Sequence, residues 1–143
     1  MPADAAASLG IGRAIGAYAI TLLIFFAIDL VWLGVVAKNF YRQHIGHLMS
    51  QDVNWGAAGL FYAVYIAGIV FFAIKPAFEA GSAARALVYG AAFGFVAYAT
   101  YDLTNQATMR DWPVLVTAVD LAWGTVLTST VAFLSYHASS RLL

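Results

Sequence analysis

Cysteine is absent from this chain, and charged side chains are scarce. The lack of cysteine excludes disulfide bonds, thiol catalysis and thiolate metal sites. Charged residues make up 10% of the 143 residues, whereas they make up about 25% of an ordinary soluble domain. The formal net charge is 0. The chain therefore has no strongly basic surface that would indicate a nucleic-acid partner.

Hydrophobic residues are abundant instead and account for 63% of the chain. They gather in four stretches, each close to the roughly 20 residues that a helix needs to cross a bilayer. The predicted spanning helices cover residues 15–36, 57–74, 84–103 and 113–136, with Lys75 and Pro76 ending the second. We therefore predict an all-α polytopic membrane protein, a single domain over residues 1–143, folded as an antiparallel bundle of four transmembrane helices.

Three aspartates, each followed by leucine, interrupt the apolar stretches: Asp29, Asp102 and Asp120. Four antiparallel spans bring the end of the first, the end of the third and the start of the fourth to one side of the membrane. At 1.5 Å per residue, Asp29 and Asp120 both lie roughly 10 Å below that interface. A carboxylate inside a bilayer is costly and indicates a functional site by default. We therefore expect the chemistry of the protein at this end of the bundle.

Asp29 and Asp120 are the candidate catalytic residues. Their matched depths on antiparallel helices would let the side chains face each other, where they would share a proton or bind a cation. Trp32 and Trp123 follow the two aspartates at the same offset, one turn away, and their indole N–H groups can donate hydrogen bonds. The structural alternative is a helix–helix hydrogen bond without any turnover.

Five further residues are candidates for ligand binding beside Trp32 and Trp123: Tyr62, Tyr65, Tyr101, Asp102 and Asn105. Aromatic side chains would supply apolar contacts, and the few polar groups would fix the orientation of a ligand. The tyrosines could equally be interfacial. Asp102, near the predicted end of its helix, could instead satisfy groups of the following link.

Other features of the same segments suit packing or anchoring. Gly90-x-x-x-Gly94 and the stripe of Thr117, Asp120, Gly124 and Thr128 indicate close helix–helix contact. Trp55 and Trp112 fall where an aromatic belt at the membrane interface is expected.

A metal site is not predicted, and no cofactor signature is present. The weak alternative is His44-x-x-His47, which places two imidazoles on one face of a helical link. Together with Asp52 or Asp102 they would approximate an iron site with two histidines and one carboxylate.

Four sequence strings carry a family resemblance. The chain resembles the DUF2177-type family of small four-helix bacterial inner-membrane proteins through Phe26-Ala27-Ile28-Asp29-Leu30-Val31-Trp32-Leu33-Gly34, Phe61-Tyr62-Ala63-Val64-Tyr65, Tyr98-Ala99-Thr100-Tyr101-Asp102-Leu103-Thr104-Asn105 and Val119-Asp120-Leu121-Ala122-Trp123-Gly124. The resemblance implies a fold and a location. It implies no activity and no catalytic residue.

The leading functional hypothesis is the binding or modification of an apolar, lipid-like small molecule in a pocket near the two aspartates. If the protein is an enzyme, Asp29 or Asp120 would be its general acid or base. One alternative is proton- or cation-coupled transport, with a homodimer supplying enough helices. Another is a non-catalytic subunit of a larger membrane complex. Membrane lipids are expected partners in every case.

The distribution of cations predicts an orientation. Four cations fall on the side of the termini (Arg13, Lys75, Arg85 and Arg141), against three on the side of the aspartates (Lys38, Arg42 and Arg110). The positive-inside rule then favours a cytoplasmic N-terminus in the bacterial inner membrane.

Overall fold

The computed structural model describes residues 9–143, and within that range the chain is helical with no strand. The elements are α1 (Ile11–Val31), a π-helical segment (Trp32–Val36), α2 (Phe40–Ile45), a 3₁₀ turn (Gly46–Leu48), α3 (Trp55–Ile69), a second π-helical segment (Val70–Ile74), α4 (Lys75–Ala80), α5 (Ala83–Thr108) and α6 (Val114–Leu142).

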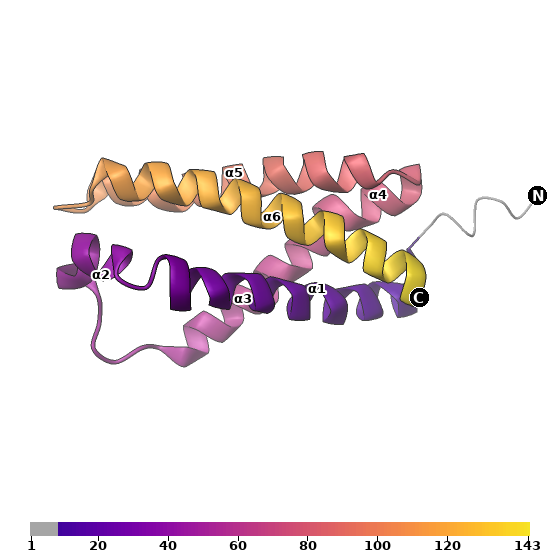
Figure 1. The fold of residues 1–143 in the computed structure, drawn as a ribbon, viewed down its shortest axis with the longest axis horizontal. Helices are drawn as coiled ribbons and strands as arrows, with labels where there is room; N and C mark the ends of the chain where they lie inside the picture. Colours follow the sequence, from indigo (N-terminus) through magenta and orange to yellow (C-terminus); the bar gives the residue numbers. More distant parts are fainter. Residues whose placement is uncertain (1–8) are drawn as a thin grey trace, which may run out of the picture.

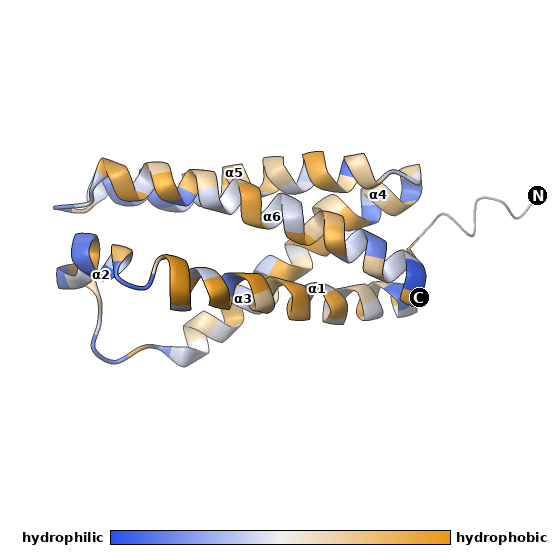
Figure 2. Ribbon diagram, viewed as in Figure 1, coloured by the Kyte–Doolittle hydropathy of each residue, from blue (hydrophilic) through white to orange (hydrophobic). Residues whose placement is uncertain are grey.

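Four continuous helical segments are long and apolar enough to cross a membrane: Ile11–Val36, Trp55–Ala80, Ala83–Thr108 and Val114–Leu142. Figure 2 shows hydrophobic residues along these segments, with hydrophilic residues gathered around α2 and near the end of α6. The predicted polytopic four-helix bundle is confirmed. The start of α1 and the end of α6 lie at the same end of the molecule (Figure 1), as four antiparallel spans require.

Side-chain caps set the starts of two spans. The Asn54 side chain accepts a hydrogen bond of 3.0 Å from the backbone N–H of Ala57, and α3 begins at Trp55. The Ser82 hydroxyl accepts one of 3.2 Å from the backbone N–H of Arg85, which begins α5. Because these caps satisfy backbone donors that a helix leaves free, each helix begins one or two residues before its predicted start.

The second span does not end at Lys75 and Pro76 as predicted. Pro76 lies in the first turn of α4, directly after the π-helical segment Val70–Ile74, and the helix continues to Ala80. A proline lacks the backbone N–H of an ordinary residue and is tolerated in a first helical turn. Gly81 then ends the helix in a left-handed conformation with φ 58°, and the Ser82 N–H donates to the Ala77 carbonyl at 3.0 Å.

The last two helices are also longer than predicted. Helix α5 continues to Thr108 and α6 to Leu142. The sequence prediction ended where hydropathy falls, but polar residues outside the hydrocarbon layer still form helix. As a result Asp102 lies inside α5 and not at its end.

The tightest contact in the bundle joins α5 to α6. A Cβ atom on Gly94 would collide with the Gly124 carbonyl oxygen and the Thr128 side chain, and one on Gly90 would lie 2.8 Å from the Thr128 carbonyl. The predicted packing role of these glycines is confirmed. Helix α1 packs on α6.

The second span crosses the others obliquely (Figure 1). Its π-helical segment and α4 pack on α5, whereas the N-terminal half of α3 leans away toward the end that carries α2. The bundle is therefore closed around the α5–α6 contact and more open beside the first turns of α3.

We expect Gly94→Ala to lower the free energy of unfolding by about 1–3 kcal/mol, because the added methyl group meets a backbone carbonyl that cannot move aside. Gly59→Ala is the matched control, since a Cβ atom there has open space around it. Thermal unfolding of both variants in the same detergent provides the measurement. Equal stability of the two variants would contradict the close α5–α6 contact.

Candidate ligand pocket

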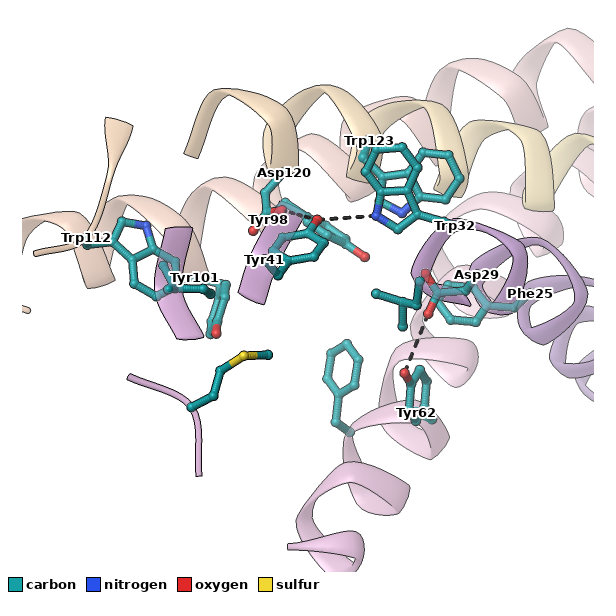
Figure 3. A pocket seen from close by; sticks show the side chains of 14 residues that line it. Phe25, Asp29, Trp32, Tyr41, Tyr62, Tyr98, Tyr101, Trp112, Asp120 and Trp123 are labelled. Atoms are coloured by element: carbon teal, nitrogen blue, oxygen red, sulfur yellow. Dashed lines mark hydrogen bonds between the residues drawn. The ribbon is translucent and has the colours of Figure 1, made fainter. Parts of the chain in front are cut away.

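A cavity of about 340 Å³ opens at the α2 end of the bundle. Helices α1, α2, α3, α5 and α6 all contribute side chains to it, and nine of its fourteen lining residues are aromatic (Figure 3): Phe25, Trp32, Tyr41, Phe61, Tyr62, Tyr98, Tyr101, Trp112 and Trp123. Two carboxyl groups, those of Asp29 and Asp120, complete its polar lining. The cavity is of a size that suits a small molecule.

Tyr41 ties α2 to the bundle. Its hydroxyl donates a hydrogen bond of 2.6 Å to Oδ1 of Asp120 and accepts one of 3.3 Å from Nε1 of Trp32. Figure 3 shows this chain of three side chains along one wall of the cavity. Sequence reasoning missed Tyr41, because a tyrosine in a polar link next to a membrane span looks like an ordinary interfacial residue.

Asp120 also interacts with Asp102, whose side chain is fully buried. Neither oxygen of Asp102 has a hydrogen-bond donor among residues 9–143. Two ionised carboxylates have no proton to donate to each other, so Asp120 as a carboxylate cannot supply the donor that Asp102 lacks. Asp102 does not line the cavity.

The expected pairing of Asp29 with Asp120 is therefore corrected. Both line the same cavity, but each is held by a different tyrosine: Asp29 accepts a long hydrogen bond of 3.5 Å from Tyr62, and Asp120 accepts from Tyr41. Figure 3 shows the two carboxyls on separate parts of the wall. Asp120 meets Asp102 instead, because α5 and α6 are the two helices in closest contact.

The indoles of Trp32 and Trp123 stack on each other, with centroids 4.2 Å apart and rings inclined by 9°. The Trp32 N–H, at the end of the first span, reaches Asp120 of α6 through the Tyr41 hydroxyl. The Trp123 side chain of α6 is directed toward Asp29 of α1. The Trp123 N–H is buried and forms no hydrogen bond of good geometry in the described part of the chain.

The other candidate ligand-binding residues divide into two groups. Tyr62 and Tyr101 line the cavity. Tyr65 lies in the core, where its hydroxyl is 2.7 Å from Oγ1 of Thr128. Asn105 is not among the residues that line this cavity, and its side chain lies beside Tyr101 one turn earlier.

Trp112 does not belong to an interfacial belt as expected. It is 9% exposed, donates a hydrogen bond of 3.2 Å to Thr117 and lines the cavity. Trp55, at 76% exposed, remains compatible with the belt. Phe25, Phe61 and Tyr98 are further lining residues that the sequence did not single out. In an apolar helix, an aromatic residue that lines a cavity cannot be distinguished by its type from one that faces lipid.

A second hollow of about 590 Å³ lies between α3 and α5, where the N-terminal half of α3 leans away. We call it the side groove; it is lined by Ala57, Ala58, Phe61, Tyr65, Ala97, Tyr98, Tyr101 and Asp120. Four of these residues, Phe61, Tyr98, Tyr101 and Asp120, also line the cavity. The two spaces therefore adjoin, and Asp120 lies where they meet.

The weak metal alternative at His44 and His47 lacks its third ligand. Nδ1 of His44 is 2.8 Å from the Phe40 carbonyl, and Nε2 of His47 is 4.0 Å from Asp111. Neither Asp52 nor Asp102 joins them, since no group of three histidine or acidic side chains within residues 9–143 could hold a metal ion.

Replacing Tyr41 with phenylalanine should loosen α2 from the bundle, because the hydroxyl is the donor to Asp120. A hydrogen bond to a charged group is worth about 1.5–3 kcal/mol, so tryptic cleavage after the exposed Arg42 should become roughly tenfold faster or more. Tyr89→Phe is the control, since Tyr89 is 42% exposed and its hydroxyl forms no hydrogen bond in the described part of the chain. Unchanged cleavage of the Tyr41 variant would mean that this contact does not hold α2.

Burial, followed by the hydrogen bond to Asp120, raises the pKa of Tyr41 above its ordinary value of 10.0. Because the folded-state pKa is the higher one, the stabilisation is complete below pH 10 and is lost only as the pH rises through the folded value. We therefore expect the tyrosinate absorbance of the wild type and of Tyr41→Phe to be equal at pH 10. A larger wild-type signal, by the amount of half a tyrosinate, would show that Tyr41 titrates normally.

Comparison with known proteins gives a family. The model of a family described as "Predicted membrane protein (DUF2177)" matches residues 14–137, a range that includes every aspartate of the spans and leaves out only the first residues of α1 and the last residues of α6 among the spanning helices. A search of curated proteins found no match, and neither did a search of solved structures. The chain belongs to the DUF2177 family of predicted membrane proteins.

Proposed function

We propose that this membrane protein binds, and has the groups to modify, an apolar lipid-like small molecule in the cavity beside Asp29 and Asp120. The observation that carries the proposal is the junction of two spaces: an aromatic cavity with two carboxyls, and a side groove between two spanning helices. Ligand sites are typically apolar hollows with a few convergent polar groups.

The side groove gives the proposed ligand a route from the bilayer. It is lined mainly by alanine and aromatic side chains, and it lies between α3 and α5 within the spanning segments. The neighbouring surface of α3 is apolar, with Leu60 66% and Val64 63% exposed. An alkyl chain could occupy the groove while its polar end reaches Asp120.

Asp120 is the group best placed for proton transfer in this proposal. It lies at the junction of cavity and groove, accepts a hydrogen bond from Tyr41 and neighbours Asp102. A carboxyl group positioned within reach of a ligand is a general acid or base. Asp29 lies on another part of the wall and would contact a different portion of the ligand.

We also propose the bacterial cytoplasmic membrane as the location, with the N-terminus in the cytoplasm. The support is the excess of lysine and arginine at the end opposite the cavity. In this orientation the cavity opens toward the outer side.

Filling the side groove tests the proposal. We expect native mass spectrometry of the purified wild type to show a bound apolar small molecule, and Ala97→Trp to reduce its occupancy at least tenfold, because Ala97 lines the groove. Val96→Trp is the matched control, since Val96 is adjacent and 60% exposed. Equal occupancy in both variants, or no bound molecule in any of the three folded proteins, would count against the proposed site.

A further inference from the structure

Three carboxyl groups inside the spanning segments have no cationic partner among residues 9–143. Asp29 is 7% exposed, Asp120 is 6% exposed and Asp102 is fully buried. The ion pairs in the described part of the chain join His47 to Asp111 and Lys75 to Glu79, and none involves these three residues. A buried carboxylate without a partner is costly, so a proton or a cation must neutralise this cluster.

The hydrogen-bond donors nearby do not complete the cluster. Asp120 has one close donor, Tyr41. Asp29 has a distant donor, Tyr62, at 3.5 Å, and the Trp123 N–H is directed toward it without a hydrogen bond of good geometry. Asp102 has none, although it is buried and directed at Asp120 on the edge of the cavity. The unpartnered Asp102 is a second buried carboxyl next to Asp120, and a cation bound nearby would favour its ionised form.

The walls of the cavity suit an organic cation. Aromatic faces carry negative potential, and cages of aromatic rings recognise substituted ammonium groups. The stacked pair of Trp32 and Trp123 lies beside both carboxyls, and tyrosine rings form much of the remaining wall. Among the described residues that line the cavity there is no lysine, arginine or histidine that would attract an anionic ligand.

We infer that the cavity selects a ligand with an alkyl-substituted ammonium group, held between the aromatic rings and the carboxyls of Asp29 and Asp120, with its alkyl chain in the side groove. This inference rests on the proposed function and names the class of its ligand. The aromatic walls distinguish it from a bare metal ion, because an indole face binds an ammonium group without supplying a coordinating oxygen or nitrogen. A fatty acid would instead bring a further carboxylate to a cavity that two carboxyl groups already line.

Three probes of equal chain length test the inference: octyltrimethylammonium, octanol and octanoate. Each is titrated into the purified protein in uncharged detergent micelles, and tryptophan fluorescence reports occupancy because Trp32 and Trp123 line the cavity. We expect the ammonium probe to bind at least tenfold more tightly than octanol, and octanoate to bind more weakly than both. This comparison uses the wild type alone and does not depend on any variant folding.

Variants assign the selectivity to the carboxyls. Asp120→Asn and Asp29→Asn should each weaken binding of octyltrimethylammonium at least tenfold and change octanol binding less than twofold. Asp52→Asn is the control, because Asp52 is exposed and lies in the link before α3. Retained preference for the cation in both carboxyl variants would overturn the assignment.

The source of the ammonium group is distinguished by adding lipid to the micelles. Displacement of octyltrimethylammonium by phosphatidylcholine alone would identify a lipid head group, and no displacement would identify a free amphiphilic amine. Equal displacement by phosphatidylglycerol, which has no ammonium group, would overturn the inference. Equal affinity for octanol and the cation would refute the cation selectivity but leave the proposed function standing, whereas binding of no probe would count against both.

Discussion

The cost of placing carboxyl groups inside a bundle of membrane helices is the constraint on which this structure depends. For Asp120, part of this cost is offset by a hydrogen bond from Tyr41, a residue that lies outside the spanning segments. The short helix α2 must therefore fold back over the end of the bundle, and its tyrosine also accepts from the indole of Trp32. One hydroxyl group thus links a helix outside the spans, the first span and the last span.

The shape of the site follows from unequal packing. Helices α5 and α6 approach closely at Gly90, Gly94 and Gly124, where side chains larger than hydrogen would collide with the facing helix. That contact brings Asp102 against Asp120 and leaves no donor between them. On the opposite side, α3 leans away from α5, and the side groove fills the space that remains. The aspartate at the junction is therefore reached from the cavity and from the groove.

Hydropathy was sufficient to predict the number of spans and their order, because the bilayer requires long apolar helices and little else. The same argument placed Asp29, Asp102 and Asp120 at one end. The alternating direction of the spans and the depth of each aspartate, however, do not determine which helix faces meet. Asp29 was predicted to face Asp120, whereas Asp120 accepts from Tyr41 and neighbours Asp102, since helix rotation depends on the glycine contacts of α5 and α6.

The exact ends of the helices and the positions of the connecting segments could also not be predicted from the sequence. Pro76 was predicted to end the second span, but the preceding π-helical segment lets the helix continue through it. Tyr41 and Trp112 had the composition of interfacial residues, and only tertiary structure shows that both line the cavity. Their roles depend on how the segments between the spanning helices fold back over the bundle. The periodicity of the local sequence does not predict this.

Infrared difference spectroscopy of the carboxyl region tests the central claim most directly, namely that buried carboxyls at the cavity are neutralised by what occupies it. Protein with isotope-labelled aspartate would be measured with and without octyltrimethylammonium. We expect the cation to reduce the absorbance of protonated aspartate and to increase that of ionised aspartate, because it replaces the proton as the neutralising group. An unchanged carboxyl spectrum at saturating cation would show that the occupant of the cavity does not neutralise these carboxyls.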